Sequence, residues 1–419
     1  MTLFEEFQWR DMVYDATEGA QDMLAKEQVT CYIGFDPTAS SLHVGSLLPI
    51  MALARLQRFG HSPIALVGGG TGMIGDPSGK SQERTLLTIE EIDHNARGMR
   101  AQLERFLDFN ATPNAARMVN NADWLRTIGL LEFLRDTGKH FTVNYMMAKE
   151  SVKRRLDDGL SFTEFSYQLL QAHDYLHLHR TYGCTLQMGG SDQWGNIVAG
   201  ADLVRKVAQG KAHGLVMPLV TTSAGAKFGK TEAGTVWLDP QRTSPFKFYQ
   251  FWLNTDDRDV VKYLKYFTWL DQPIIGALEK TVQDAPETRE AQRTLARELT
   301  TMVHGAAATA AAERAADVLF GGSLKDASAD DILEVFADAP SVTMSVSELE
   351  ALSAAALVAR VGLAASNGEA SRVIQQGGIY LNDQRVTDGR ARISASQAIG
   401  NKVIVLRKGS RERRVVRLA

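Results

Sequence analysis

Short apolar runs alternate with amphipathic segments along the first half of this chain. The runs Val29–Phe35 and Pro63–Val67 have the length and composition of buried strands, and glycines lie at or just after their ends. Between them, Leu42–Phe59 places apolar residues at helical spacing. A strand–helix–strand order of this kind predicts an α/β domain with a parallel sheet, to which Leu215–Val220 could add a later strand.

After about Pro245 the pattern becomes helical, and few strand signals interrupt it. The stretch 321–347 then carries many Asp, Ala and Ser residues with few large apolar ones, which is typical of a linker, although Ile332–Phe336 could form a short helix. From Ser347 onward, the order helix, helix, turn and strands predicts a small α+β domain. The helices expected in the middle region are Phe246–Leu253, Asp256–Leu270, Glu287–His304 and Ala306–Leu319.

These changes of pattern divide the chain into three expected domains and a linker. An α/β domain spans residues 1–225, and a loop followed by a helical domain spans 226–335. The linker covers 336–350, and the small α+β domain covers 351–419. A chain of 419 residues is long enough for two or three domains with cores of their own.

The composition is that of an ordinary soluble protein, with 44% apolar and 23% charged residues. The N-terminal stretch MTLFEEFQWR lacks the pattern of a secretory signal peptide, and no run of about 18 apolar residues predicts a membrane span. Cys31 and Cys184 are too few for a disulfide framework and are expected as small buried residues. We therefore expect a cytoplasmic protein that does not enter a membrane.

The charge is distributed unevenly along the chain. Residues 351–419 hold 12 Lys and Arg against 4 Asp and Glu, a net charge of +8 in a chain whose total is −3. A compact basic domain on an acidic body is typical of a nucleic-acid-binding appendage, although a solvated basic surface would give the same count.

A glycine-rich loop, VGGGTGMIGDPSGK, follows the second predicted strand at residues 67–80. It contains the G-x-G-x-x-G spacing of dinucleotide sites, but Asp76 and the next residues extend the loop where that motif requires a helix. The Walker-type phosphate loop is excluded because Ile74 stands where that motif needs glycine. The loop still suits a phosphate-rich ligand, since glycine amides can approach it closely and Lys80 and Arg84 can neutralise charge.

Two further segments have properties of nucleotide-binding elements. His43-Val44-Gly45-Ser46 lies where a helix begins, and a helix N-terminus offers N–H groups and the positive end of the helix dipole to a phosphate. The segment AKFGKTEAG places Lys227 and Lys230 around a glycine, as in a mobile loop able to close on pyrophosphate. Taken alone, the first is more often a structural histidine and the second a solvated turn.

Three polar residues share one face of the helix predicted at SYQLLQAHDY. Tyr167, Gln171 and Asp174 are spaced i, i+4 and i+7, so they align on a helix of 3.6 residues per turn. Three polar groups on one face of an otherwise apolar helix need hydrogen-bond partners if that face is buried. A solvent-exposed polar face is the alternative.

These segments, in this order, resemble class I aminoacyl-tRNA synthetases. His43–Ser46 is similar to their HIGH signature, and Lys227–Thr231 is similar to their KMSKS signature. The bacterial type of tyrosyl-tRNA synthetase is the group that the chain resembles in GFDPTASSLHVG, ALVGGGTGMIGDPSGK, VNYMMAKES, SFTEFSYQLLQAHDY, QMGGSDQWGN and TSPFKFYQFW. The resemblance covers essentially the whole chain and implies a Rossmann-like catalytic domain and, at SNGEASRVIQQGGIYLNDQRV, an S4-like RNA-binding domain.

The resemblance implies a two-step reaction in which ATP is a substrate accompanied by Mg²⁺. The carboxylate of L-tyrosine attacks the α-phosphate of ATP, giving tyrosyl-adenylate and pyrophosphate, and the terminal adenosine hydroxyl of tRNA(Tyr) then takes the tyrosyl group. No protein nucleophile is required, so catalysis rests on positioning and on stabilising charge in the transition state. No tightly bound protein metal is expected, because the phosphates hold the Mg²⁺.

The resemblance also implies roles for individual residues. Tyr167 and Gln171, with Asp76, would bind the α-ammonium group of tyrosine. Asp174, with Tyr32, would hydrogen-bond its phenolic hydroxyl. The other expected ligands are Asp36, Gly189, Asp192 and Gln193 at the tyrosine carboxylate and the ribose, Thr38, His43, Gly45 and Ser46 at ATP, and Lys80, Arg84, Lys227, Lys230 and Thr231 at the departing pyrophosphate.

Transfer RNA and a second subunit complete what the resemblance implies. The family is a homodimer, with one tRNA lying across both subunits. Lys149, Arg205 and Lys206 match positions that would meet the acceptor arm. In the basic tail, the candidate phosphate-binding residues are Arg372, Lys402, Arg407, Lys408, Arg411, Arg413 and Arg414.

The chain departs from the family pattern at the fourth HIGH position, which is Ser46 rather than histidine. A serine hydroxyl can still bind ribose or phosphate, but we expect His43 to carry most of the signature's effect. Ile33 stands in the pocket strand where some relatives carry cysteine. The alternatives are a tryptophan-specific class I enzyme, which should lack the Tyr32 and Asp174 pair, a synthetase-derived non-catalytic RNA-binding protein, and a nucleotide-binding oxidoreductase.

Overall fold

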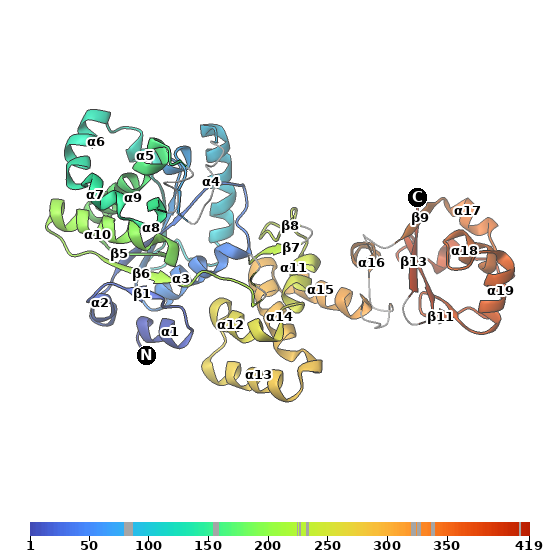
Figure 1. The fold of residues 1–419 in the computed structure, drawn as a ribbon. Helices are drawn as coiled ribbons and strands as arrows, with labels where there is room; N and C mark the ends of the chain where they lie inside the picture. The colour runs from blue at the N-terminus through green and yellow to red at the C-terminus, as the bar shows by residue number, and fades with distance from the viewer. Residues whose placement is uncertain are drawn as a thin grey trace. The chain divides into compact units, whose positions relative to one another are not determined.

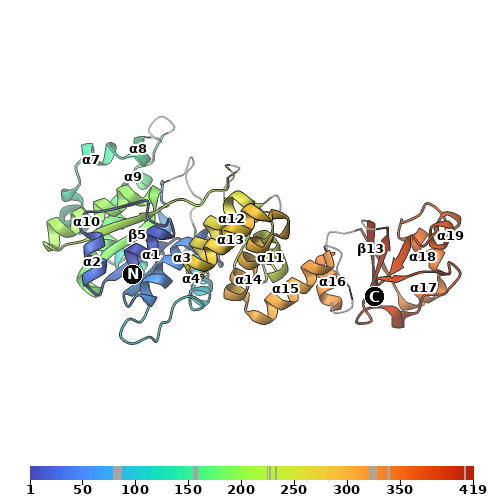
Figure 2. The same ribbon diagram turned by 90° about the horizontal axis from the view of Figure 1, so that it is seen from below.

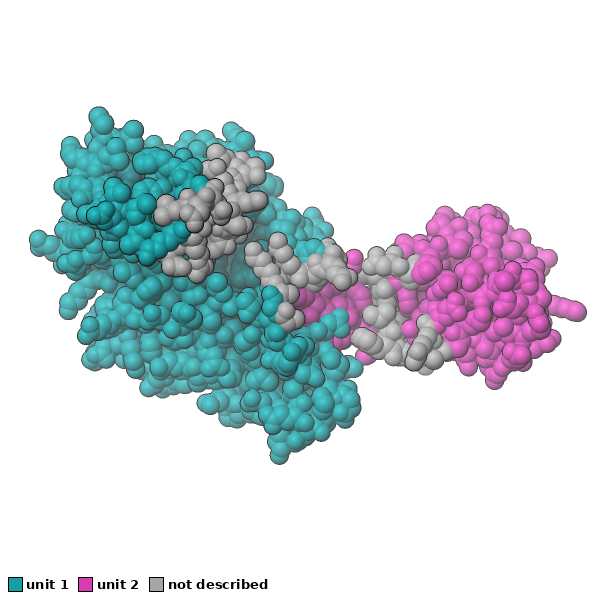
Figure 3. Space-filling view, in the orientation of Figure 1, with its two compact units in different colours: residues 1–243, 254–295 teal, residues 244–253, 296–419 magenta. Residues whose placement is uncertain are grey.

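The structure is a computed structural model of the 419-residue chain. It describes residues 1–78, 87–153, 159–223, 225, 228–231, 234–319, 324, 328–336, 340–409 and 412–419. Two compact units are present (Figure 3). Unit 1 comprises residues 1–243 and 254–295, and unit 2 comprises 244–253 and 296–419, so this division differs from the domain limits expected from sequence, which stay a prediction.

A six-stranded sheet forms the centre of unit 1 (Figure 1). Its order is β1-β6-β5-β2-β3-β4, in which β6, β5, β2, β3 and β4 are parallel and the edge strand β1 is antiparallel to β6. This confirms the expected α/β class. The strands are β1 (Asp15–Ala16), β2 (Thr30–Phe35), β3 (Ser62–Val67), β4 (Arg117–Asn120), β5 (Cys184–Gly190) and β6 (His213–Met217).

The predicted strands are present, with one change of length. The two apolar runs that predicted buried strands are β2 and β3, and both are almost wholly buried. The third predicted strand, Leu215–Val220, is β6, which ends at Met217. No pattern had indicated β4 or β5; β4 has only four residues, none of them fully buried, and β5 ends in two glycines.

Helices cover both faces of this sheet (Figure 2). On one face, α9 (Phe162–Tyr182) and α10 (Trp194–Ala208) pack together and against side chains of β2 and β3. On the other face lies α3 (Leu47–Arg58), which is buried over almost its whole length. Unit 1 also contains α1 (Leu3–Trp9), α2 (Ala20–Lys26), α4 (Ile89–Leu103), α5 (Ala122–Leu125), α6 (Leu130–Asp136), α7 (Val143–Met147), α8 (Glu150–Lys153), α12 (Asp257–Phe267), α13 (Gln272–Asp284) and the hairpin β7 (Lys230–Thr231) and β8 (Gly234–Thr235).

The caps of α9 explain where this long helix starts and stops. Ser161 accepts a hydrogen bond from Glu164 N at 3.2 Å and so satisfies one of the unpaired N–H groups of the first turn. Gly183 follows the last turn with a φ of 62°, a left-handed conformation that glycine adopts without strain. These two caps fix where α9 begins and ends, and so which residues of the helix lie beside the carboxyl ends of the strands.

Unit 2 contains helices and a second sheet. The helices predicted in the middle of the chain are confirmed as α11 (Pro245–Leu253), α14 (Glu290–His304), which begins in unit 1, and α15 (Ala306–Leu319), with α12 in unit 1. No pattern had indicated α13. The five-stranded sheet has the order β11-β10-β12-β13-β9, antiparallel except for the pair β13 and β9. Its strands are β9 (Ser341–Met344), β10 (Ile379–Leu381), β11 (Gln384–Arg385), β12 (Val403–Lys408) and β13 (Glu412–Leu418). The helices in the same part of the chain are α16 (Ala329–Val335), α17 (Val346–Ala351), α18 (Ala354–Arg360) and α19 (Asn367–Gln375).

Both faces of β12 are covered, which explains its continuous apolar sequence. Ile404 and Leu406 belong to the core under α17, α18 and α19. Val403 and Val405 point to the opposite face, where they pack with Ile332 of α16. The stretch interpreted as a linker therefore contributes a helix to one face and β9 to one edge of this sheet, because a few apolar residues suffice for each contact.

Candidate functional site

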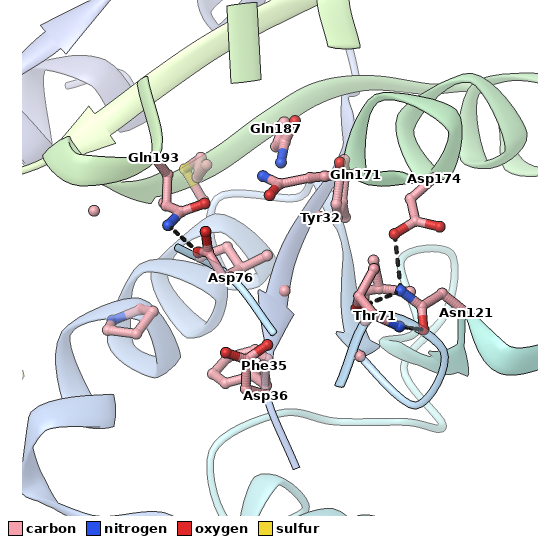
Figure 4. Close-up of a pocket in the computed structure, with 18 of the residues that line it drawn as sticks. Tyr32, Phe35, Asp36, Thr71, Asp76, Asn121, Gln171, Asp174, Gln187 and Gln193 are labelled. Carbon is pink, nitrogen blue, oxygen red and sulfur yellow. Dashed lines mark hydrogen bonds between the residues drawn. The ribbon is translucent and has the colours of Figure 1, made fainter. Parts of the chain in front are cut away.

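A pocket of about 190 Å³ opens at the carboxyl ends of the parallel strands in unit 1 (Figure 4). The chain leaves β2 for β3 on one side of the sheet, whereas β5 flanks β2 on the other side. The order of strands therefore reverses between β2 and β5, and such a switch point is where open α/β sheets bind ligands. Phe35, Asp36 and Gly189, at the ends of β2 and β5, line the pocket, and α9 closes one wall.

A buried carboxylate stands at one end of the pocket. Asp174 of α9 is 1% exposed, and its two oxygens accept hydrogen bonds from Asn121 Nδ2 and Trp124 Nε1, each at 2.8 Å (Figure 4). Burial raises the pKa of Asp174 to about 7, and the two donors oppose that rise. Asn121 is itself held by Thr71 Oγ1 at 2.9 Å, and the Trp124 ring stacks on His177.

Two buried polar atoms near this carboxylate lack partners. Within the described part of the chain, neither the hydroxyl of Tyr32 nor Oε1 of Gln187 has a hydrogen-bond partner, although both side chains are at most 2% exposed. The Tyr32 ring is fixed by edge-on contact with Tyr175, at 5.3 Å between centroids, and Tyr175 donates its own hydroxyl to His213 O. Unsatisfied polar groups this deep are costly, and they are expected where a polar ligand binds.

Amide groups surround a second carboxylate, at the end of the pocket away from Asp174 (Figure 4). Asp76 accepts a hydrogen bond from Gln193 Nε2 at 2.7 Å and from the backbone N of Ser78 at 2.9 Å. Burial, together with the negative charge of Asp36, raises the pKa of Asp76 to about 6. Asn196 Nδ2 donates to Gln171 Oε1 at 3.1 Å, so the amide of Gln171 is oriented as well.

The predicted helix face is directed into this pocket. Tyr167, Gln171 and Asp174 all line it, which rules out the alternative of a solvent-exposed face. Seen along the cavity, Asp174 lies at one end and Asp76 with Gln193 at the other, with Gln171 between them (Figure 4). The arrangement offers a hydroxyl-binding end and a cation-binding end to one elongated polar molecule.

The HIGH-like segment lies at the start of α3. His43 Nδ1 accepts a hydrogen bond from Gly45 N at 3.0 Å, and Ser46 N donates to His43 O at 2.8 Å. A Cβ at position 45 would lie 2.6 Å from His43 Cε1, so only glycine lets the imidazole lie against the backbone. Ser46 precedes α3 but its side chain makes no capping hydrogen bond.

The sequence-predicted residues divide by location. Tyr32, Asp36, Asp76, Tyr167, Gln171, Asp174, Gly189 and Gln193 line one pocket, as expected. Thr38 lines a neighbouring hollow that also includes Arg242, and Asp192 is exposed. Lys80, Arg84, Lys227 and Arg411 lie outside the described residues, as do the side chains of Lys230 and Thr231.

Sequence reasoning missed Asn121 and Gln187, which line the pocket, and also Trp124 and Asn196, which donate hydrogen bonds to Asp174 and Gln171 in its wall. Asn121 and Trp124 come from the segment after β4, and only the pairing of β3 with β4 brings that segment to Asp174. Asn196 follows the motif QMGGSDQW within the same resemblance segment, so that motif was the available signal for it.

The basic candidates for tRNA contact are held by local partners. Lys149 Nζ donates to Tyr145 OH at 2.7 Å, and Arg205 and Lys206 both pair with Asp202. In unit 2, the Arg407 guanidinium lies 4.0 Å from the centroid of the Tyr380 ring, and Lys408 Nζ donates to Leu363 O. Lys402 pairs with Asp330, Arg372 is exposed on α19, and Arg413 and Arg414 lie on β13.

The fold and the pocket define a class I aminoacyl-tRNA synthetase. Residues 24–321 match the family described as tRNA synthetases class I (W and Y), and residues 331–416 match the Tyrosine--tRNA ligase SYY-like C-terminal domain. The chain belongs to the bacterial tyrosine–tRNA ligases, and it is an enzyme of that class.

Known proteins support this assignment along the whole chain. The chain is 54% identical to the tyrosine–tRNA ligase of Roseiflexus castenholzii, covering 100% of this chain and 99% of that protein. It is 50% identical to the tyrosine–tRNA ligase of Geobacillus stearothermophilus, with 100% of both chains covered.

Solved structures share the fold. A C-terminally truncated mitochondrial tyrosyl-tRNA synthetase of Aspergillus nidulans superposes with a TM-score of 0.69 at 32% identity, covering 76% of this chain and 94% of that one. A tryptophanyl-tRNA synthetase of Encephalitozoon cuniculi, at 13% identity and a TM-score of 0.54, covers 79% of this chain and 90% of its own, and shares only the fold.

Within the described residues, no helix is long and apolar enough to cross a membrane.

Proposed function

We propose that the pocket binds tyrosine with its phenolic hydroxyl between Tyr32 and Asp174. The observation that carries this proposal is the buried Tyr32 hydroxyl beside the buried Asp174 carboxylate, two groups that a phenol can satisfy together. The α-ammonium group would lie at the other end, with Asp76, Tyr167 and Gln171. Phenylalanine is rejected by such a site because its ring would leave these buried polar groups unpaired.

Activation of tyrosine follows from this placement. With its ammonium at Asp76, the carboxylate lies toward the strand ends that carry Asp36, Gly189 and Gln193, with Asp192 nearby at the ribose. ATP would bind across Thr38 and the segment His43–Ser46, whose helix N-terminus favours phosphate. Mg²⁺ would enter with the phosphates. The cations Lys80, Arg84, Lys227 and Lys230, with Thr231, would stabilise the charge that develops on the departing pyrophosphate.

The basic tail is proposed to bind tRNA for the transfer step. This proposal assumes a catalytic domain at residues 1–225, a helical domain at 226–335 and the tail at 351–419. The tail carries a net charge of +8, and its arginines can neutralise backbone phosphates. Lys149, Arg205 and Lys206 would meet the acceptor arm. The cytoplasm, where translation occurs, is the proposed location.

A homodimer is proposed because unit 1 exposes large apolar side chains around α6 and α7. Leu131 is 80% exposed and Phe162, at the start of α9, is 79% exposed; Leu130 and Val143 are also exposed. Exposed apolar side chains of this size, concentrated between residues 130 and 162, are typical of an interface. Sedimentation of Leu131→Asp as a monomer would support the proposal, and an unchanged oligomer would contradict it.

ATP–pyrophosphate exchange with each aromatic amino acid tests the proposed pocket. We expect exchange with tyrosine and none with phenylalanine or tryptophan, and we expect Tyr32→Phe to weaken the preference for tyrosine. Equal exchange with phenylalanine would overturn the placement of the phenol.

A further inference from the structure

The segment that follows the KMSKS-like loop is joined to the HIGH-like segment by backbone hydrogen bonds. Val44 N donates to Val236 O at 3.0 Å, and Leu238 N donates to Leu42 O at 2.9 Å. His43 and Trp237 face each other in the antiparallel bridge that results. The segment after the KMSKS-like loop therefore lies directly beside the first turn of the HIGH-like segment.

Side chains fix this bridge at both ends. Ser41 Oγ accepts hydrogen bonds from Asp239 N at 3.2 Å and from Gln102 Nε2 at 2.9 Å. Thr243 Oγ1 accepts a hydrogen bond from Trp237 N at 2.9 Å. The apolar residues that flank the bridge on both strands are buried. The backbone of Trp237 is thus held in one place relative to His43.

The indole of Trp237 lies between a histidine and an arginine. Its centroid is 6.1 Å from that of the His43 ring, at an interplanar angle of 78°, which is an edge-on contact. The Arg242 guanidinium lies 3.4 Å from the centroid of the Trp237 ring, a close cation–π contact. Because Arg242 stacks on the indole, the orientation of the indole against the imidazole is restricted.

The hydrogen bond that His43 accepts determines which of its ring nitrogens can donate to a ligand. Nδ1 accepts from Gly45 N, so in a neutral imidazole the proton resides on Nε2, which is then a hydrogen-bond donor. Gly45 supports the imidazole on one side and Trp237 contacts it on another. A donor held in this way is prearranged for a phosphate oxygen whose charge grows in the transition state.

We infer that Trp237, oriented by Arg242, is a positioning residue for His43 in the formation of tyrosyl-adenylate. This inference rests on the proposed role of His43 and extends it to the residues that orient the imidazole. Trp237 does not line the tyrosine pocket, so its loss leaves tyrosine binding intact. Since a displacement of about 1 Å can cost on the order of 100-fold in rate, loss of the indole lowers the rate of activation.

A double-mutant cycle on the full-length enzyme tests the inference. The variants are His43→Ala, Trp237→Ala and the pair together, and the measurements are kcat and KM for tyrosine and for ATP in pyrophosphate exchange. We expect Trp237→Ala to lower kcat by about tenfold or more with the KM for tyrosine unchanged. In the His43→Ala background, the same substitution has no further effect.

Conservative and matched variants separate positioning from folding. Trp237→Phe keeps an aromatic edge against His43 and restores most of the rate. Arg242→Ala removes the cation that orients the indole, so it lowers kcat as Trp237→Ala does. Because the Arg242 side chain is exposed, this substitution does not lower the melting temperature. Trp269→Ala is the matched control, because Trp269 also carries a stacked arginine, Arg58 at 3.4 Å, but is not paired with His43.

The outcomes distinguish this inference from the proposed function. Losses that add in the double variant, or wild-type kcat in both Trp237→Ala and Arg242→Ala, overturn the inference while leaving the role of His43 in place. Wild-type kcat in His43→Ala refutes the proposed role of His43, and the inference with it.

Discussion

At the scale of single residues, Asp174 decides the character of the pocket. Its carboxylate is fully buried, yet its only counter-groups among the described residues are two neutral donors, Asn121 and Trp124. Neutral donors stabilise the charged form without supplying an opposite charge, so burial prevails and the pKa rises to about 7. The protonation of Asp174 is thus sensitive to each donor near physiological pH.

Trp124→Phe removes one donor while keeping a ring against His177. We expect the pKa of Asp174 to rise further, because an interaction that favours the carboxylate is lost. Tyrosine affinity at pH 7 falls by about tenfold or more, as for a hydrogen bond to a charged group. The pH dependence of tyrosine binding, followed by calorimetry, shows the inflection at a higher pH. Trp9→Phe, which removes an indole donor to Glu6 far from the pocket, should leave this profile unchanged.

The raised pKa of Asp174 also makes stability depend on pH. Between pH 4 and 7 the folded enzyme keeps a proton that the unfolded chain has lost, so the stability of the ligand-free enzyme falls as pH rises through this window. The loss is on the order of 4 kcal/mol at most. In Asp174→Asn this component is absent, so the stability of wild type relative to this variant should decline from pH 5 to pH 8 in urea unfolding. A stability difference that stays constant over this pH range would contradict the raised pKa of Asp174.

At the scale of elements, the glycines of two helices differ in what they do. Gly183 ends α9 with a φ of 62°, whereas Gly276 lies inside α13 without a positive φ. A Cβ at either position meets no atom within 4 Å, so crowding does not separate the two sites. The two sites differ only in backbone conformation, and the left-handed conformation at Gly183 makes the end of α9 depend on glycine.

The same substitution is therefore expected to have opposite signs at these positions. Gly183→Ala forces an alanine into the left-handed region and destabilises the enzyme by about 1 kcal/mol. Gly276→Ala stabilises it by roughly 0.5–1 kcal/mol, because alanine favours a helix interior. Thermal unfolding measures both, and a stabilising Gly183→Ala would show that the cap is not needed.

Sequence patterns found the elements that carry long apolar runs or regular helical spacing and missed the strands β4 and β5. The strands β2 and β3 are largely apolar, and α3 places its apolar residues at helical spacing, so the type and position of these elements were predictable. β5 was not, because Gln187 and its final glycines serve the pocket rather than the core. Among site residues, the face of α9 followed from periodicity, whereas Asn121 and Trp124 reach Asp174 through sheet pairing, which no local pattern reveals.

At the scale of the whole molecule, the tail begins earlier than its charge suggests. Ile332 and Phe336 pack in one core with Val403, Val405 and Val415, so α16 belongs with the sheet of the tail. A cut within the expected linker 336–350 would leave these apolar side chains without cover. A functional division of the chain is therefore better tested with a cut before α16.

A chain ending after Leu319 should activate tyrosine but charge tRNA poorly. The pocket residues and the bridge between His43 and Trp237 lie wholly in unit 1, so pyrophosphate exchange should stay within a few-fold of the full chain. Aminoacylation should fall strongly because the basic tail is gone. Both rates are measured side by side, with a chain ending near residue 338 as the comparison. Undiminished charging by the shorter chain would refute the role of the tail.

The pairing of β9 with β13 has a consequence for how the protein is made. β13 follows β9 in the chain only after α17, α18, α19, β10, β11 and β12, yet the two strands pair, with Val415 opposite Ser341 and Leu418 opposite Met344. During synthesis, unit 1 is complete while the tail still lacks the strand that joins its first edge to the rest. A chain cut just before β13 would therefore carry an intact catalytic pocket and a tail in which β9 lacks its partner strand.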